Sequence, residues 1–125
     1  MGLRKNIVAI VAAIAAVGCA SAPAPNPADL RLWKTVRLPA ASTGAFSTCL
    51  ENGFYKAHSV THTSVRQVRG DGVTRVETWG ASQGLQASAL VFDDGRIELR
   101  ESTAPLVDTS GERAVLLACF DQLSP

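Results

Sequence analysis

The sequence predicts an α+β fold, a two-layer sandwich in which two helices cover one face of an antiparallel sheet of four to five strands. Short segments that alternate apolar and polar residues are separated by turns rich in Gly and Asp, as is typical of antiparallel strands. Two other segments repeat apolar residues at helical spacing. Each of these helical faces carries a cysteine, and both need a sheet to cover.

The predicted domain begins near Asp29 with a strand followed by a helix. Residues 30–38 alternate apolar and polar side chains, and Lys34 interrupts the apolar face, which favours an edge position in the sheet. The helix is predicted over 42–52, with Ser42 as a suitable N-cap and Gly53 as a natural C-terminal stop. Its apolar face is formed by Ala45, Phe46, Cys49 and Leu50.

Extended segments follow in the middle of the chain and are predicted to pair in an antiparallel sheet. They cover 55–69, 73–79, 85–92 and 96–100. Asp93-Asp94-Gly95 is a strong hairpin signal before the last of them. In that last segment Ile97 and Leu99 are expected to face the core, so Arg96, Glu98 and Arg100 are expected on the opposite, polar face of the sheet.

A second helix is predicted near the C-terminus, reaching about residue 122. Thr109 and Glu112 have the spacing of a capping box at its start. Its apolar face is formed by Val115, Leu116, Cys119, Phe120 and Leu123. There is no internal repeat that would indicate a different architecture.

The N-terminus has the order of a secretory signal peptide. Arg4 and Lys5 precede eleven apolar residues at 7–17, and small residues follow. Eleven residues of helix span about 16 Å, which is too short for a hydrocarbon core of about 30 Å. A buried helix is the alternative, but it would have to be apolar on all sides directly behind two cations.

Ala16-Val17-Gly18-Cys19 resembles the lipobox of bacterial lipoproteins, with Ala16 where that family prefers Leu. The resemblance implies a diacylglyceryl group on Cys19, cleavage just before it, and an acylated new amine, with palmitate as an expected acyl chain. Ordinary signal-peptide cleavage at the same bond is the competing interpretation. The chain is similar to small proteobacterial lipoproteins of unknown function. In that class the residue after the lipidated cysteine determines to which membrane the protein is sorted. Because Ala20 is not Asp, the resemblance implies that the protein is anchored in the inner leaflet of the outer membrane and faces the periplasm, where the source cell has two membranes.

The cysteine count agrees with this interpretation. The chain has three cysteines, and lipidation of Cys19 leaves Cys49 and Cys119 as an even pair in an oxidising compartment. A Cys49–Cys119 disulfide would clamp the two helices, and two separate buried thiols are the alternative. Three segments are therefore predicted: a signal peptide over 1–18, the lipidated cysteine and a Pro/Ala-rich tether over 19–28, and one domain over 29–125.

Two motifs that suggest catalysis or metal binding have simpler interpretations. Residues 80–84 match G-x-S-x-G, but a strand follows Ser82 where a nucleophile elbow needs a helix, and no histidine follows it. His58 and His62 could share a metal on a helix, but the predicted strand holds them too far apart. Both are therefore expected to be surface histidines, and no metal or cofactor is expected.

Composition and surface residues favour a binding function. The net charge of +1 lacks the basic footprint of a nucleic-acid binder. We expect a membrane-anchored binding module without catalytic activity that binds an envelope protein. The alternative is an inhibitor of a secreted or periplasmic hydrolase that acts through loop 80–84 or loop 102–111. An enzyme is least expected. The candidate interaction residues are Trp33, Trp79, Arg96, Glu98 and Arg100.

Overall fold

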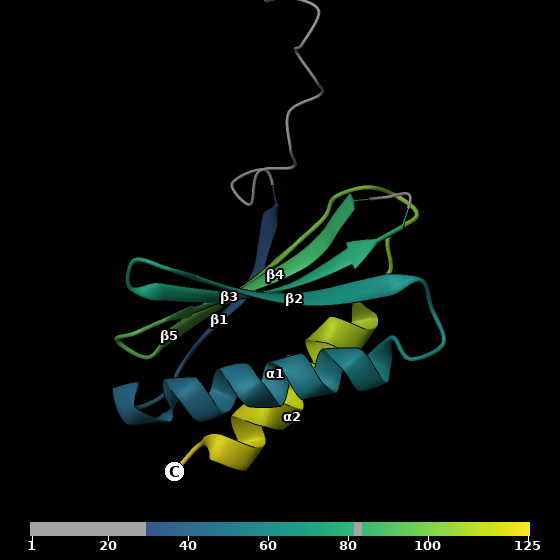
Figure 1. The fold of residues 1–125 in the computed structure, drawn as a ribbon. Coiled ribbons are helices and arrows are strands. Elements are labelled where there is room, and N and C mark those ends of the chain that lie inside the picture. The colour runs from purple at the N-terminus through teal and green to yellow at the C-terminus, as the bar shows by residue number, and fades with distance from the viewer. Residues whose placement is uncertain (1–29, 82–83) are drawn as a thin grey trace, which may run out of the picture.

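The structure is a computed structural model, and it describes residues 30–81 and 84–125. The predicted signal peptide, Cys19, the tether and Ser82 lie outside the described residues. The described chain forms an antiparallel sheet with two helices on one of its faces, so the α+β prediction is confirmed (Figure 1). None of the helices in these two ranges is long and apolar enough to cross a membrane.

The sheet has five strands in the spatial order β1-β5-β4-β3-β2, and all neighbours are antiparallel. The strands are β1 (Arg31–Arg37), β2 (Thr63–Gly70), β3 (Val73–Gly80), β4 (Gly84–Phe92) and β5 (Arg96–Glu101). The helices are the short 3-10 helix η2 (Ala40–Ser42), α1 (Thr43–Ala57) and α2 (Ser110–Leu123). The first strand lies at an edge of the sheet, as Lys34 predicted.

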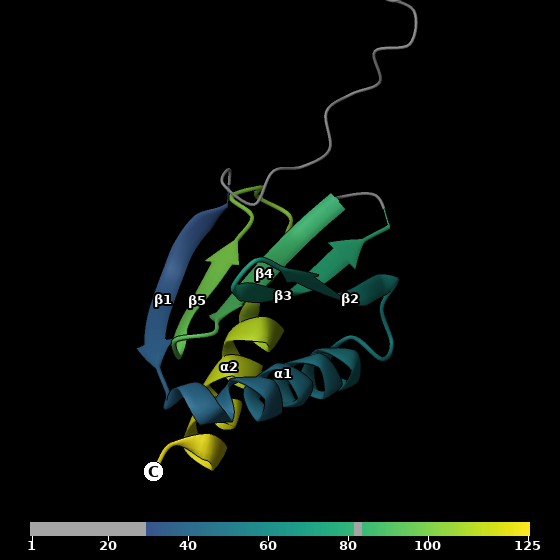
Figure 2. The same ribbon diagram turned by 60° about the vertical axis from the view of Figure 1, so that its left-hand side comes forward.

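Both helices lie against the same side of the sheet, and the core fills the space between the layers (Figures 1 and 2). The largest fully buried side chains come from every layer: Phe46, Leu50 and Phe54 of α1, Leu116 of α2, and Val76, Val91, Ile97 and Leu99 of the sheet. The start of β1 and the C-terminus lie at opposite ends of the molecule.

The two helices are joined by the predicted Cys49–Cys119 disulfide, whose Cα atoms are 5.9 Å apart. Gly53 lies one turn further along α1 and faces Val115 of α2. A Cβ atom at Gly53 would come within 2.4 Å of Val115 Cγ1. Gly53 therefore permits close contact between the helices, and the prediction that it ends the helix was wrong.

The first helix differs from its prediction at both ends. It continues to Ala57, so the extended segment predicted over 55–69 is helix and turn up to residue 62, and β2 begins only at Thr63. The continuation buries Phe54 completely, and this tertiary gain outweighs the local stop signal of Gly53. Ser42 makes no side-chain capping bond; instead the Thr43 hydroxyl donates to the Ala40 carbonyl at 2.9 Å.

The hairpin predicted at Asp93-Asp94-Gly95 joins β4 to β5. Gly95 has φ of +101°, and a Cβ atom there would lie 1.9 Å from the Leu38 carbonyl oxygen. The same close approach lets the Leu38 amide donate to the Gly95 carbonyl at 2.9 Å. This hairpin thereby holds the end of β1 against the sheet.

Candidate functional site

The face of the sheet turned away from the helices carries most of the arginines of the domain. Because Ile97 and Leu99 point into the core, Arg96, Glu98 and Arg100 point to this outer face. Cross-strand partners share a face, so the register extends the set from β5 to residues of β1, β2 and β3. We call this set the arginine face: Arg37, Arg66, Arg75, Glu77, Trp79, Arg96, Glu98 and Arg100.

Positive charge is in excess on the arginine face, with five arginines against two glutamates. Glu98 is held by Arg100, whose Nη2 lies 3.0 Å from Oε1, and by Arg96, whose Nε lies 3.6 Å from Oε2. Arg37 is paired directly across the strands with Arg96, a like-charge arrangement that weakens a sheet.

Trp79 provides an aromatic centre beside these charges. Its indole Nε1 donates to Glu77 Oε1 at 3.2 Å, and the Arg66 guanidinium lies 5.2 Å from the indole ring centroid. The register shifts between Thr78 and Trp79, which pairs Trp79 with the buried Leu85 on the same outer face. Arginine and tryptophan around a small apolar base are the composition of interface hot spots.

Trp33 lies apart from the arginine face and packs against the core, with the Arg113 guanidinium 4.8 Å from its ring centroid. Arg113 also donates two hydrogen bonds of 2.7 Å to the buried carboxylate of Glu101. Burial alone would raise the pKa of Glu101, but hydrogen bonds from Arg113 and Thr109 and the charges of Arg113 and Arg31 hold it below its ordinary value.

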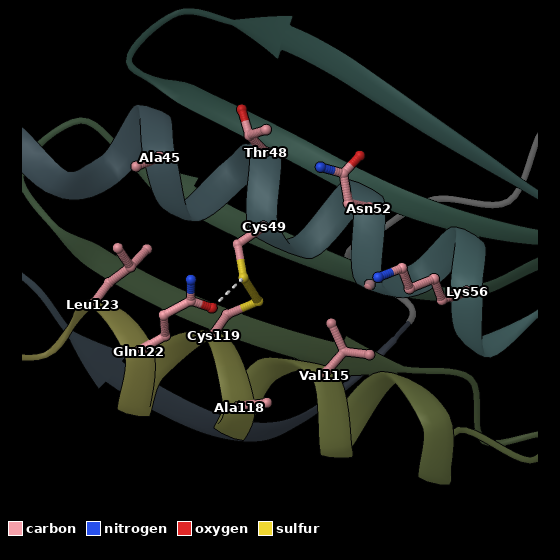
Figure 3. A pocket seen from close by; sticks show the side chains of 11 residues that line it. Ala45, Thr48, Cys49, Asn52, Lys56, Val115, Ala118, Cys119, Gln122 and Leu123 are labelled. Atoms are coloured by element: carbon pink, nitrogen blue, oxygen red, sulfur yellow. Dashed lines mark hydrogen bonds between the residues drawn. A yellow bond between two sulfur atoms is a disulfide. The ribbon is translucent and has the colours of Figure 1, made fainter.

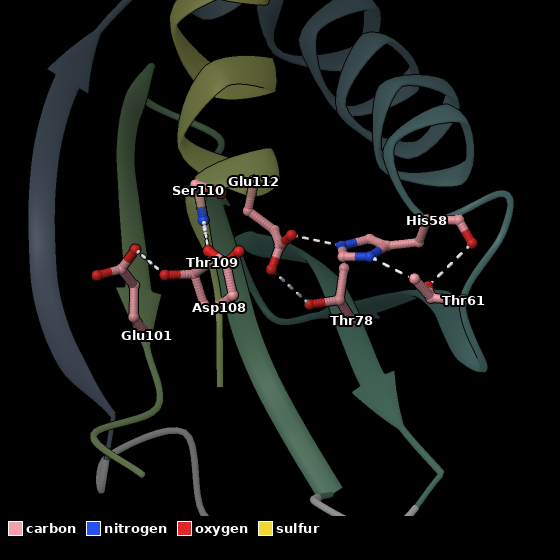
Figure 4. Close-up of polar contacts among 8 residues, drawn as sticks. All are labelled: His58, Thr61, Thr78, Glu101, Asp108, Thr109, Ser110 and Glu112. Carbon is pink, nitrogen blue, oxygen red and sulfur yellow. Dashed lines mark hydrogen bonds and ion pairs between the residues drawn. The ribbon is translucent and has the colours of Figure 1, made fainter. Parts of the chain in front are cut away.

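A second polar cluster links the two helices to the inner face of the sheet (Figure 4). His58 Nε2 forms an ion pair with Glu112 Oε1, and the Thr78 hydroxyl donates to Glu112 Oε2 at 3.4 Å. Glu112 is completely buried, and the His58 side chain is 11% exposed. Burial raises the pKa of Glu112 above its ordinary value, and the charge and hydrogen bond of His58 only partly offset this effect.

Two sequence predictions were wrong at this cluster. His58 is not a surface residue, because it ends α1 instead of lying in a strand, and its ring therefore reaches the first turn of α2. The capping box is also not formed: the Thr109 hydroxyl donates to Glu101 at 2.6 Å, and Glu112 faces His58. The only sequence signal for a site at His58 was its spacing from His62. Its partner in the structure, Glu112, lies 54 residues away in sequence.

Two hollows border the described helices. A cavity of about 500 Å³ lies beside His58 and is also lined by His62, Asp108 and Ser110. A groove of about 480 Å³ runs between α1 and α2 over the disulfide (Figure 3). In residues 30–81 and 84–125, no group of three or more His, Cys, Asp or Glu side chains is placed to hold a metal ion.

Arg69 of β2 and Asp93, in the turn after β4, form a bidentate ion pair with both hydrogen bonds at 2.7 Å.

No protein-family model, no curated protein and no solved structure matches this chain.

Proposed function

We propose that the chain is a lipid-anchored binding module of the bacterial envelope whose arginine face binds the acidic surface of a partner protein. The observation that carries the proposal is this face itself, because neither helix covers it and it combines excess arginine with Trp79. Arginine binds carboxylates through two parallel hydrogen bonds and also stacks on flat groups, which suits it to a protein interface.

The paired glutamates favour a protein partner over a plain anionic membrane. Glu77 and Glu98 lie among the arginines and fix their guanidinium groups in place. The Ser88 hydroxyl is buried in the same face between Arg100 and Glu77, and no described residue is its hydrogen-bond partner. A mixed pattern of this kind discriminates between partners by position as well as by charge.

The anchor of the module is Cys19, on the lipobox resemblance given above. A tether of nine residues would reach roughly 28 Å at about 3.1 Å per residue, enough to hold the domain clear of the membrane surface. Several acyl chains together give firm attachment. The partner is then a periplasmic or envelope protein, at the inner leaflet of the outer membrane where the cell has two membranes.

Site-specific photocrosslinking in cells of the source organism tests this proposal. The crosslinking residue is placed at Thr35, which is exposed beside Glu98 on the outer face, and in a matched protein at the exposed Leu117 of α2. We expect a protein adduct from position 35 only. Arg66→Glu with Arg75→Glu should abolish it, and Lys34→Glu with Lys56→Glu, which changes the same charge away from this face, should not.

Three results of this experiment contradict the proposal. They are equal adducts from positions 35 and 117, an adduct that survives the reversal of Arg66 and Arg75, and adducts that contain phospholipid alone. The last of these would assign the arginine face to the membrane surface.

Inhibition of a hydrolase is the second candidate, and one observation favours it. Leu106 is 86% exposed at the tip of the loop between β5 and α2. This loop is held by hydrogen bonds from the Ala104 amide to the Ser102 hydroxyl and from the Val107 amide to the Ala104 carbonyl. An inhibitor of this kind would slow hydrolysis by a lysozyme or a protease, and Leu106→Asp would remove this inhibition. Unchanged hydrolysis by both classes of enzyme would contradict the inhibitor function.

A further inference from the structure

The two edges of the sheet differ in how they are protected against pairing with another strand. Edge strand β1 carries a register shift between Leu32 and Lys34, and Lys34 is paired with the core residue Leu99, so a charge points to the inner face. Bulges and inward charges are the devices by which proteins block an edge. The opposite edge strand, β2, pairs with β3 over eight successive residue pairs without any shift and contains no proline.

The backbone of β2 therefore presents an ordered row of hydrogen-bonding groups at its free edge (Figures 1 and 2). In an antiparallel strand alternate residues direct both backbone groups to the same side. The Tyr55 hydroxyl donates to the Val65 carbonyl at 3.3 Å, which marks Val65 as facing away from β3. Gln67 and Arg69 follow at the same alternation, so their N–H and C=O groups also face the free edge.

Side chains at this edge specify what it can accept. On the helix side, the ring of Tyr55 is 53% exposed and lies next to Val65, which provides an apolar surface for one face of an added strand. On the other side Arg66 is exposed, and β2 contains two arginines and no acidic residue. An added strand would meet an apolar contact on one face and a cation on the other.

We propose that the free edge of β2 binds an extended segment of a partner protein in which acidic and apolar residues alternate. Main-chain hydrogen bonds to Gln67, to Arg69 and to the amide of Val65, whose carbonyl already accepts from Tyr55, would supply affinity. Arg66 and Tyr55 would select the side chains. Arg66 belongs to the arginine face as well, but the outward main-chain groups of β2 do not, so either proposal can fail without the other.

A second copy of the chain fits this edge poorly. Antiparallel pairing of two β2 strands would place the Arg66 side chains of both copies on the same outer face of the joined sheet, and β2 supplies no acidic side chain to separate them. Like charges directly opposite one another destabilise a sheet. Charge complementarity therefore assigns the edge to an acidic strand.

A peptide-binding experiment on the full chain in detergent tests the proposal. The probe is the acetylated peptide Thr-Glu-Val-Glu-Val-Glu-Thr, and the matched control replaces each Glu by Lys. We expect the acidic peptide to bind at least tenfold more tightly than the control. Hydrogen exchange should show new protection at the amides of Val65, Gln67 and Arg69, and not at amides of β1.

Two variants separate edge pairing from attraction by charge alone. Gln67→Pro removes an outward N–H that makes no bond to β3, a position where edge strands tolerate proline, and should lower affinity at least tenfold. Gln67→Ala keeps that N–H and should bind as the unchanged protein does. Should the proline variant not fold, Arg66→Glu serves instead and should reverse the preference between the two peptides.

Several outcomes would overturn the proposal. They are equal binding of the two peptides, affinity that Gln67→Pro and Arg66→Glu both leave unchanged, and protection confined to β1 or β5. Self-association of the chain that protects the same three amides would assign the edge to a second copy and would equally overturn it.

Discussion

Glu101 and Glu112 are both buried, but their surroundings push their pKa values in opposite directions. Arg113, Thr109 and Arg31 outweigh the effect of burial on Glu101, and its pKa is lowered. Burial dominates at Glu112, where His58 and Thr78 compensate only in part, and its pKa is raised. The first carboxyl therefore contributes stability that is lost as the pH falls, and the second contributes stability that is lost as the pH rises.

Glu112→Gln should change the pH dependence of stability. The protonated Glu112 carboxyl is favoured in the folded state, so its contribution is fully present below the unfolded pKa and is lost as the pH rises through the raised folded pKa. The free energy of unfolding of the unchanged protein, relative to the variant, should accordingly fall as the pH rises above the ordinary pKa of a glutamate. Urea unfolding at a series of pH values measures this, and parallel profiles for the two proteins would contradict the assignment.

Arg113→Ala should destabilise the domain measurably, because it leaves the buried carboxylate of Glu101 without its charged partner. The loss should be smaller at acidic pH, where Glu101 is protonated. Arg37→Ala, at an exposed position of β1, is the control and should stay within about 0.5 kcal/mol of the unchanged protein. Equal effects of the two substitutions in urea unfolding would show that the Glu101–Arg113 pair contributes nothing specific.

At the scale of elements, the close contact between α1 and α2 limits the size of the side chain that position 53 can accept. Gly53→Ala would place a Cβ atom 2.4 Å from Val115, a β-branched side chain that cannot turn aside easily. We expect a loss of about 1–3 kcal/mol from overpacking. Gly44→Ala, in the same helix with nothing within 4 Å, should instead stabilise by up to about 1 kcal/mol. Thermal unfolding of both variants checks the sign, and two stabilised proteins would contradict the tight contact.

The disulfide closes a separation of 70 residues and should stabilise the domain by about 4 kcal/mol through the unfolded state. Cys49→Ala with Cys119→Ala should lower the melting temperature by many degrees, and a reducing agent should shift the unchanged protein in the same direction. A melting temperature that neither change alters would show that the helices are held by packing alone.

Elements with strong local signals were predicted well from the sequence. Strands β1 and β5, the Asp93-Asp94-Gly95 turn and the apolar spacing of α2 depend on neighbouring residues, and all four are present. Within β1 the predicted alternation is broken by the register shift after Leu32, which leaves Leu32 exposed. The errors occurred where a distant contact overrides a local signal. Gly53 was interpreted as a helix stop because no residue near it indicates its contact with Val115, which lies 62 residues away in sequence.

At the scale of the whole molecule, the candidate site was only partly visible from the sequence. Strand alternation alone placed Arg96, Glu98 and Arg100 on one face. Arg66 and Arg75 join them only through the register of β2 and β3, which the sequence does not specify. Trp33 and Trp79 looked equivalent in sequence, yet the structure packs Trp33 against the core and places Trp79 among the arginines.

The proposed envelope role depends on the proposed lipid anchor, and the mass of the intact protein from cell membranes tests this anchor most directly. We expect a chain that begins at Cys19 and carries a diacylglyceryl group and a further acyl chain, and we expect Cys19→Ser to release the protein from membranes. A protein that retains Met1, or one cleaved before Cys19 without any lipid, would contradict membrane anchoring and the binding function proposed at the membrane.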